Sequence, residues 1–276
     1  MVGSKTWINS LKYILVLIGI SIAVFPYLYM LLQSLAPWNE INRNIIPTSL
    51  TLRSYKWLFL GTSIVPPKPW AKALLNSTIV TVSSTFLMVF SAAIVGYALS
   101  KLEFKGRGAI YNFILFQMFY PAIILLVPTF LIVKSMGLYN NYLGMILPKA
   151  MSIWAIFMYT SFFKSLPQEV IDSARVDGAS EFRIIFRIAI PMSRSITIVV
   201  ALFLFMARWE ELLWDLIIVK DYTLMPLNVL IATMKGPYGG YPGPMYAASV
   251  LLTLPVLLLF IIFSKDFAKG IKLVFK

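Results

Sequence analysis

The sequence predicts an all-α integral membrane protein with six transmembrane helices. Three observations lead to this fold class: 59% of the 276 residues are apolar, only 13% are charged, and the mean hydropathy is +0.82. A soluble domain is typically about half apolar and about a quarter charged. So little charge in a chain of this length is typical of proteins whose helices contact lipid.

Uncharged stretches locate four of the six spans. They separate Lys12 from Glu40, Lys72 from Lys101, Arg107 from Lys134, and Lys235 from Lys265, and each is 26 to 29 residues long. Because about 20 helical residues cross a hydrocarbon core, each stretch holds one span. Two further spans, at about 142–163 and about 195–219, contain charge. The first span is too long for a cleaved signal peptide and no small-residue cleavage site follows it, so a signal anchor fits better.

The distribution of charge predicts the orientation. The formal net charge of +13 comes from 24 basic and 11 acidic residues. With both termini inside, 14 of the 24 basic residues lie in inner segments, which matches the usual cytoplasmic bias of Lys and Arg. The termini are therefore expected in the cytoplasm, and no nucleic-acid partner is needed to explain the charge.

Two connections are expected outside. The connection at about 36–72 holds five prolines, so it is expected to be ordered coil or short elements. A glycine- and proline-rich segment at 236–244 is either a flexible turn or a surface for an external partner.

The inner segment 165–191 has the pattern of two short amphipathic helices joined at a glycine. Ser165 and Gln168 have capping-box spacing, and Pro167 suits a first helical turn. Asp177 and Gly178 break the first helix. The apolar positions are Val170, Ile171 and Ala174 in the first helix, and Phe182, Ile185, Phe186 and Ala189 in the second.

Such a segment can lie on lipid headgroups or insert into a groove on another protein. Its acidic residues, Glu169, Asp172, Asp177 and Glu181, argue against an anionic lipid surface. The sequence therefore favours a protein partner.

The same segment resembles the coupling loop, or EAA motif, of binding-protein-dependent ABC importer permeases. The family pattern is Glu-Ala-Ala, three residues, Gly, nine residues, then Ile-x-Leu-Pro. Here Asp172-Ser173-Ala174 stands at the triplet, Gly178 at the glycine and Ile188-Ala189-Ile190-Pro191 at the end. Residues 174–180 and Trp209-Glu210-Glu211-Leu212-Leu213-Trp214 resemble the carbohydrate-uptake subfamily of the maltose-permease G-subunit type. Further matching motifs are Leu75-Asn76-Ser77, the stretch 96–101 and the stretch 137–144, so the resemblance covers nearly the whole chain.

The resemblance implies a type I ABC importer transmembrane domain. Residues 1–72 would form an N-terminal membrane anchor helix and outer loop, and residues 73–276 the permease core, with coupling helices at about 165–190. The implied partners are a second permease subunit, two ATPase subunits, an extracytoplasmic solute-binding protein and membrane lipid. The residues implied at the ATPase contact are Glu169, Asp172, Ser173, Ala174, Asp177, Gly178 and Arg183.

The chain carries no chemistry of its own. It contains no cysteine and no histidine, which excludes a disulfide, a thiol nucleophile, a Cys/His zinc site and a histidine general base. It also lacks a Walker A pattern, so ATP and magnesium are expected on the partner ATPase subunits. We therefore expect a non-catalytic subunit of the plasma membrane with no cofactor and no metal site.

Charges inside the fifth span predict a substrate pathway, because such charges usually face a cavity or a partner. Arg208, Glu211 and Asp215 would share one helical face, and Lys149 would lie at similar depth in the fourth span. The candidate residues are Lys149, Arg208, Trp209, Glu210, Glu211, Trp214 and Asp215. Aromatic faces beside carboxylates suit a sugar. Alternatively, the tryptophans belong to an interfacial belt and Arg208 with Glu211 forms only an internal ion pair.

We therefore predict a permease subunit of an ATP-driven importer for a sugar or oligosaccharide. Within the same family, the solute could instead be glycerol phosphate, an amino acid or a peptide. A secondary transporter driven by Na⁺ or H⁺ is less consistent with the absent histidine and the coupling loop. A membrane scaffold without transport would leave the span-five charges unexplained.

Overall fold

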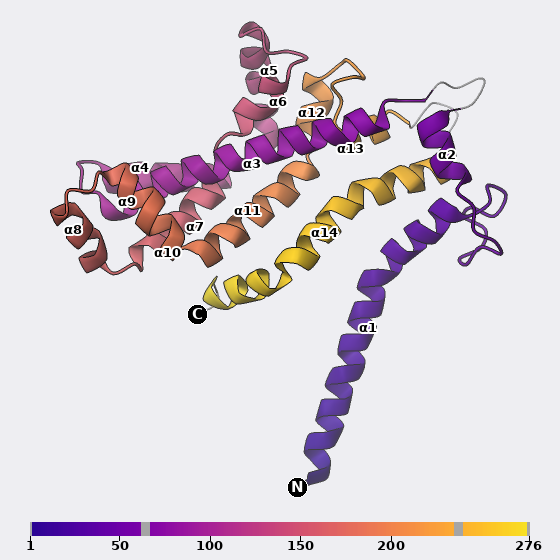
Figure 1. Ribbon diagram of the computed structural model, residues 1–276, viewed down its shortest axis with the longest axis horizontal. Helices are drawn as coiled ribbons and strands as arrows, with labels where there is room; N and C mark the ends of the chain where they lie inside the picture. The colour runs from indigo at the N-terminus through magenta and orange to yellow at the C-terminus, as the bar shows by residue number, and fades with distance from the viewer. Residues whose placement is uncertain (1, 62–66, 235–239, 275–276) are drawn as a thin grey trace. The chain divides into compact units, whose positions relative to one another are not determined.

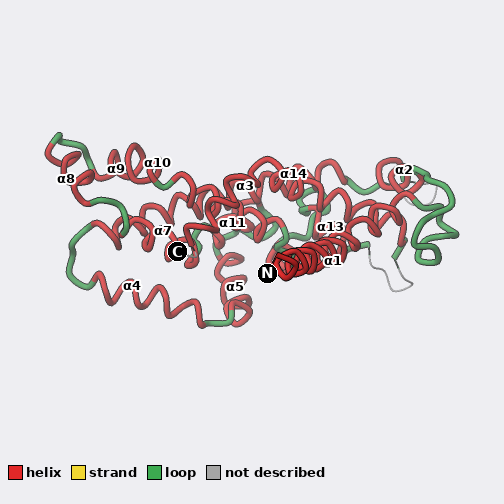
Figure 2. The backbone as a smooth tube through the Cα atoms, turned by 90° about the horizontal axis from the view of Figure 1, so that it is seen from below, coloured by secondary structure: helices red, strands yellow, loops and turns green. Residues whose placement is uncertain are grey.

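The computed structural model describes residues 2–61, 67–234 and 240–274, and all regular secondary structure within these ranges is helical (Figures 1 and 2). The chain forms two compact units, one of residues 1–70 with 231–255 and the other of residues 71–230 with 256–276. In the predicted glycine- and proline-rich segment, residues 236–239 lie outside the described residues.

The first unit is built on α1 (Val2–Leu35), whose stretch Leu11–Leu35 has a mean hydropathy of 2.4. An ordered loop connects it to α2 (Arg53–Leu60). Gln33 organises this loop, because its amide donates to the Asn44 carbonyl oxygen at 2.8 Å and its Oε1 accepts from the Asn42 amide at 2.8 Å. The prediction of coil with short elements between the first two spans is confirmed over the described residues.

The second unit has its core between α3 (Trp70–Lys101), α7 (Ile153–Lys164) and α11 (Arg194–Trp209). Gly96 allows α3 and α7 to approach closely, since a Cβ there would lie only 2.7 Å from the Cβ of Tyr159. The Tyr159 ring packs on Phe163 at 5.3 Å between centroids, and its hydroxyl donates to Thr197 Oγ1 of α11 at 3.0 Å. α14 (Pro242–Val274) passes from the first unit into the second.

Three helices, α1, α3 and α14, are long and apolar enough to cross a membrane, and three bent pairs raise the number to six when each pair is one span. The third of these pairs joins Glu181–Met192, part of the predicted coupling segment, to Arg194–Trp209 at 88°. The first bent pair joins α4 (Arg107–Phe116) and η1 (Gln117–Phe119) to η2 (Ala122–Leu125) and α5 (Leu126–Ser135), at 96°. Figure 2 shows this sharp turn between α4 and α5. Pro121 explains it, because proline has no N–H and holds the preceding Tyr120 extended, at ψ 122°.

The second bent pair joins α6 (Tyr142–Ile146) and η3 (Leu147–Lys149) to α7, at 43°. The Ser152 side chain starts α7 anew by accepting a hydrogen bond from the Ala155 amide at 3.3 Å. Gly144 in α6 is required by packing, because a Cβ there would collide with the Leu138 carbonyl oxygen. This contact gives the Gly137–Gly144 motif a structural reason.

The predicted continuous fifth span at about 195–219 is wrong. α11 ends at Trp209, residues 210–212 are not helical, and α12 (Leu213–Ile218) begins after them. A short helix α13 (Leu227–Ala232) follows. The break coincides with the charged residues. Because the helix is interrupted there, Asp215 can pair with Arg208, which a straight helix would hold too far away.

Candidate functional site

The coupling loop consists of α8 (Gln168–Val176), a turn, and a second helical stretch formed by α9 (Glu181–Ile184), the π-turn η4 (Ile185–Ala189) and α10 (Ile190–Met192). These helices lie together near the C-terminal end of α3 (Figure 1). Gly178 makes the turn in the left-handed region, at φ +76°, which confirms that glycine is needed there.

The start of α8 differs from the predicted capping box. Pro167 occupies the position before the helix, and no side chain caps it. Ser165 still belongs to the end of α7, at φ −81° and ψ −11°, and its hydroxyl donates to the Phe162 carbonyl oxygen at 2.7 Å. The capping-box prediction is therefore wrong, because the serine is used by the preceding helix.

α8 has one face toward the core and one toward solvent. Ile171 and Ala174 are buried as predicted, whereas Val170 is exposed. The solvent face forms a shallow pocket lined by Glu169, Asp172, Ser173, Val176 and Asp177. Of the predicted ATPase-contact residues, Ala174 is thus a core residue, while the other six, including Gly178 and Arg183, are exposed.

The second helical stretch turns a different face to the core than predicted. Ile184, Ile185 and Ala189 are buried, while Phe182 and Phe186 are exposed. The π-turn causes this change of phase, because it inserts an extra residue into one turn. Pro191 makes the wider turn favourable, since its ring would clash with the carbonyl four residues earlier in a regular α-helix.

A polar network holds the two halves of the loop together. Arg175 Nε donates to Glu181 Oε1 at 2.9 Å, and its Nη1 donates to Asp172 Oδ1 at 3.1 Å. The Tyr97 hydroxyl of α3 donates to the second oxygen of Glu181 at 2.6 Å. Burial disfavours ionisation of Glu181, but the hydrogen bonds from Arg175 and Tyr97 outweigh it and lower the pKa of this carboxyl.

Lys101, the last residue of α3, anchors the loop a second time. Its Nζ donates to the Leu166 carbonyl oxygen at 2.7 Å and to Gln168 Oε1 at 3.3 Å. In return, Arg175 Nη2 donates to the Lys101 carbonyl oxygen at 3.4 Å. The sequence reasoning assigned no role to Tyr97, Lys101 or Arg175, although the matching stretch 96–101 pointed to this end of α3.

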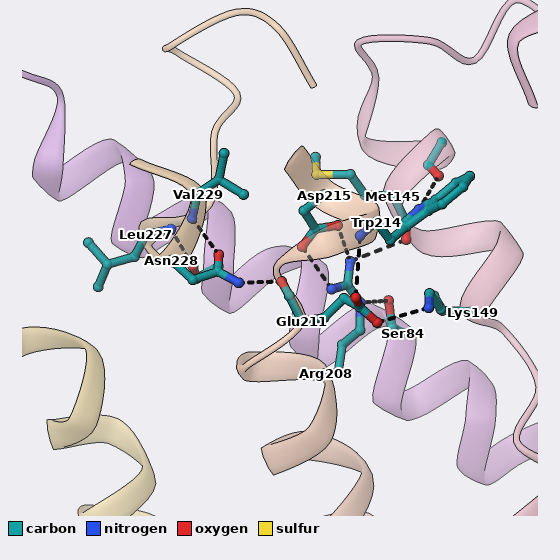
Figure 3. Close-up of polar contacts among 12 residues, drawn as sticks. Ser84, Met145, Lys149, Arg208, Glu211, Trp214, Asp215, Leu227, Asn228 and Val229 are labelled. Carbon is teal, nitrogen blue, oxygen red and sulfur yellow. Dashed lines mark hydrogen bonds and ion pairs between the residues drawn. The ribbon is translucent and has the colours of Figure 1, made fainter. Parts of the chain in front are cut away.

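The charged cluster lies where α11 breaks (Figure 3). Arg208 forms two hydrogen bonds of 2.8 Å with the carboxylate of Asp215 in α12. It also donates to the Met145 carbonyl oxygen at 3.2 Å and to Ser84 Oγ of α3 at 3.3 Å. Arg208 and Asp215 are 4% and 1% exposed, so this ion pair is internal. Its partner is Asp215, and the predicted pair of Arg208 with Glu211 is wrong.

Glu211 instead pairs with Lys149, at 2.8 Å between Oε2 and Nζ (Figure 3). The two side chains are 24% and 36% exposed, so the pair is open to solvent. Glu210 is also exposed. The Asn228 side chain donates to the Glu211 carbonyl oxygen, which holds the broken backbone in place.

Both predicted tryptophans are packed inside the second unit. Trp209 is 2% exposed and stacks on Phe205 at 5.6 Å. Trp214 is also 2% exposed, and its indole N–H donates to the Gly144 carbonyl oxygen at 3.1 Å. Of the predicted pathway residues, Lys149, Glu210 and Glu211 are therefore the ones with exposed or partly exposed side chains within this chain.

Asn76 fixes the segment that follows α12, a role that the sequence reasoning missed. Its side-chain amide donates to the carbonyl oxygens of Thr223 and Met225 at 2.9 and 3.1 Å, and it accepts from the Tyr142 hydroxyl. The adjacent Ser77 Oγ accepts from the Leu227 amide at 2.8 Å. The Leu75-Asn76-Ser77 motif was the available signal, since two polar residues on a spanning helix need partners.

The helices of membrane-spanning length identify this chain as an integral membrane protein. The chain belongs to the family of binding-protein-dependent transport system inner membrane components, which matches residues 58–272. That family consists of membrane subunits of ABC transporters, and a multi-pass membrane location follows from it.

Curated relatives cover nearly the full chain. The arabinooligosaccharides transport system permease protein AraQ of Bacillus subtilis is 31% identical over 90% of this chain and 88% of its own length. The trehalose/maltose transport system permease protein MalG of Thermococcus litoralis is 29% identical over 95% of both chains. The lactose transport system permease protein LacG of Rhizobium radiobacter is 26% identical over 94% and 93%.

Solved structures agree on the fold. A chain of a bacterial ABC transporter involved in the import of the acidic polysaccharide alginate matches with a TM-score of 0.80 at 21% identity, over 96% of this chain and 98% of that chain. A second structure, of a bacterial alginate ABC transporter with a pentasaccharide-bound periplasmic protein, matches with a TM-score of 0.63 at 18% identity, over 94% and 93%. The type I ABC importer architecture predicted from the sequence is confirmed at the level of the fold.

Proposed function

We propose that this chain is the permease subunit of an ATP-driven importer for a sugar or oligosaccharide, delivered by an extracytoplasmic binding protein. The names of the relatives support a saccharide substrate, since AraQ, LacG and MalG are named for arabinooligosaccharides, lactose and trehalose or maltose. The proposed complex also contains a second permease subunit and two ATPase subunits, which bind ATP and magnesium and hydrolyse the ATP.

The observation that carries this proposal is the coupling loop. α8 and the residue after it, Asp177, present three acids and the 88% exposed Val176 to solvent, while Arg175, Lys101 and Tyr97 tie the loop to α3. A displaced, rigidly anchored helix transmits its movement to the helices that hold it. ATP-driven closure of the ATPase subunits would therefore move α3 with the loop, as well as α7 and α11, which flank it in the chain.

We place both termini in the cytoplasm, on the side of the coupling loop, because the basic residues concentrate there. Residues 1–72 then serve as anchor helix and outer loop, and residues 73–276 as the permease core. In the pathway, we assign solute contact to Lys149, Glu210 and Glu211. Arg208 and Asp215, with Trp209 and Trp214, support that surface from within.

Cross-linking tests the docking of the loop. A cysteine at Val176, in a chain that has none of its own, should form a cross-link to the ATPase subunit in the assembled complex. A cysteine at Lys105, which is exposed on the adjacent inner loop, is the matched control and should not. Equal cross-linking at both positions would contradict the assigned contact face.

Uptake energetics test the transport class. With ATP held constant, collapse of the proton-motive force should leave uptake by reconstituted complex unchanged. An immediate loss of uptake would favour an ion-driven transporter. Competition with unlabelled solutes then separates a saccharide from glycerol phosphate, an amino acid or a peptide.

A further inference from the structure

The short helix α2 is fixed to the last turn of the spanning helix α1. The Thr51 amide donates to the Leu35 carbonyl oxygen at 2.7 Å, which replaces a hydrogen bond that the helix end lacks. The hydroxyls of Ser34 and Tyr55 share a hydrogen bond of 2.9 Å. Ser34 is fully buried, so α2 is held at the depth at which α1 ends.

That depth is the headgroup layer of the membrane. The apolar stretch Leu11–Leu35 has 25 residues, and at 1.5 Å per residue it is about 37 Å long. The hydrocarbon core is about 30 Å thick, so the last turn of α1 reaches beyond it. From this length, α2 is expected at the membrane–water interface on the side opposite the N-terminus.

The segment around α2 exposes large apolar side chains at this level. Leu50, Leu52 and Leu60 are 65%, 60% and 73% exposed, and Phe59 is also exposed. A cluster of exposed aliphatic side chains marks a surface that another apolar phase covers. At the interface, that phase is the boundary of the acyl chains.

Two cations border this apolar surface. Arg53 and Lys56 are exposed, and no carboxylate pairs with either of them among the residues the structure describes. The nearby acid, Glu40, is engaged by the amide and the hydroxyl of Thr48, which lower the pKa of its carboxyl. Arg53 lies over the Trp38 ring at 4.3 Å from its centroid, which orients the guanidinium.

These cations line a shallow pocket together with aromatic and apolar groups. Its lining residues are Trp38, Arg53, Lys56, Trp57, Leu60 and Gly61. The pocket contains no acid, so it fits an anion. Tryptophan beside lysine or arginine, next to exposed leucine, is the composition of segments that lie in the membrane interface.

We propose that α2 is an interfacial helix that binds anionic phospholipid in the leaflet opposite the N-terminus. Leu50, Leu52 and Leu60 enter the acyl boundary, and Arg53 and Lys56 bind the lipid phosphate. An acidic protein surface would also satisfy the two cations. The depth set by Leu35 and the exposed leucines favour lipid, because the acyl boundary at that depth covers such leucines directly.

Depth measurements on the assembled complex in vesicles test the apolar contact. Nitroxide labels on L52C and L60C should be more accessible to oxygen than to a water-soluble nickel chelate. I18C, in the middle of α1, is the lipid reference, and K220C, in an exposed loop, is the water reference. The cysteine-free chain gives the labelling background. Labels at both 52 and 60 that behave like the water reference would overturn the proposal.

Lipid selectivity tests the two cations. A bimane label on L60C should be quenched more by brominated phosphatidylglycerol than by brominated phosphatidylcholine at the same mole fraction. R53Q and K56Q should each lower this preference about fivefold at low salt, since one basic residue near an anionic surface contributes about that much. R43Q, an exposed cation of the same loop outside the pocket, should keep it. Absence of a preference in the unsubstituted pocket would overturn the lipid assignment, as would burial of the label only after addition of the solute-binding protein.

Discussion

Arg208 and Asp215 face each other across a break in the polypeptide helix and share two hydrogen bonds of 2.8 Å. Asp215 follows Arg208 by seven positions in the chain, and both are almost completely buried. The arginine adds bonds to the Met145 carbonyl oxygen and to Ser84 Oγ, so one side chain joins four helices: α3, α6, α11 and α12. The pair is therefore a structural centre of the second unit.

Removing one partner of this pair should destabilise the protein strongly. Arg208→Met leaves the Asp215 carboxylate buried without a counter-charge, which typically costs about 3–5 kcal/mol. Thermal unfolding of the purified complex measures the effect as a lower midpoint. The double variant R208M/D215L should recover much of the loss, because it leaves no unpaired charge. Lys149→Met breaks the more exposed pair and should cost only about 0–1 kcal/mol.

Glu211 and Trp214 should respond differently to substitution. Glu211→Gln removes a partly exposed charge, so we expect altered uptake kinetics with normal amounts of assembled complex. Trp214→Ala creates a cavity beside α6 and loses the hydrogen bond to Gly144, so we expect reduced assembly and a destabilisation of about 3–5 kcal/mol. Uptake and assembly are measured on the same membranes. Normal uptake kinetics for Glu211→Gln would remove this residue from the pathway.

At position 178, the backbone conformation that a substituting residue can adopt should matter more than the size of its side chain. The φ of +76° at Gly178 is costly for residues with a Cβ, yet no atom lies within 4 Å of the position such a Cβ would take. Gly178→Val should therefore strain the turn by about 1–2 kcal/mol and lower the uptake obtained per ATP hydrolysed. Gly178→Asn is the matched control, because asparagine adopts this conformation more readily. Uptake and ATPase association unchanged by valine would contradict the assignment of the turn to coupling.

The Arg175–Glu181 pair should couple the loop to α3. Reversing one charge, with Arg175→Glu, should reduce uptake relative to ATP hydrolysis. The introduced carboxylate would repel Glu181, which holds the second half of the loop to α3. The double reversal R175E/E181R restores opposite charges and should recover part of the coupling. Tyr97→Phe removes only the hydrogen bond from α3 and should have a smaller effect in the same direction. Unchanged coupling in all three variants would show that the network only stabilises the loop.

The carboxyl group of Glu181 should make the protein less stable in acid. The pKa of Glu181 is lowered below its ordinary value of 4.5, so its ionised form stabilises the folded protein. That contribution is complete above pH 4.5 and decreases as the pH falls through the lowered pKa. The melting temperature of Glu181→Gln should therefore differ most from the unsubstituted protein near neutral pH, with the two converging in acid. Glu169→Gln, at an exposed acid outside the network, is the matched control.

Much of the architecture could be predicted from the sequence. Uncharged stretches located the long helices α1, α3 and α14, because a helix that crosses a membrane needs a long apolar segment. The turn at Gly178 was also predictable, since an Asp-Gly pair interrupts a helix in a local way. These features depend on composition and short spacing, which a single sequence displays directly.

The details of the charged cluster could not be predicted in the same way. Helical spacing suggested that Arg208 would pair with Glu211. Because the helix is interrupted after Trp209, Arg208 pairs with Asp215 and Glu211 pairs with Lys149 instead. That break is stabilised by Asn228, and the arginine by Ser84 and Met145, all distant in sequence. The π-turn at Ile185–Ala189 is a second such case, because it changes the phase of the helix and leaves Phe186 exposed. Contacts between distant segments decide the first case, and a local change of helix geometry decides the second.

The partners of Arg208 also bear on how the nascent chain is inserted during translation. Ser84 and Met145 leave the ribosome well before the arginine, so we expect both acceptors to be in the membrane when the guanidinium enters it. Asp215 is synthesised only seven residues later and completes the neutralisation almost at once. Insertion of an arginine at the centre of a helix costs about 2.5–3.5 kcal/mol when the arginine has no partner. Here the arginine meets acceptors that are synthesised both before and after it. The order of synthesis supplies those acceptors in time for α11 to insert.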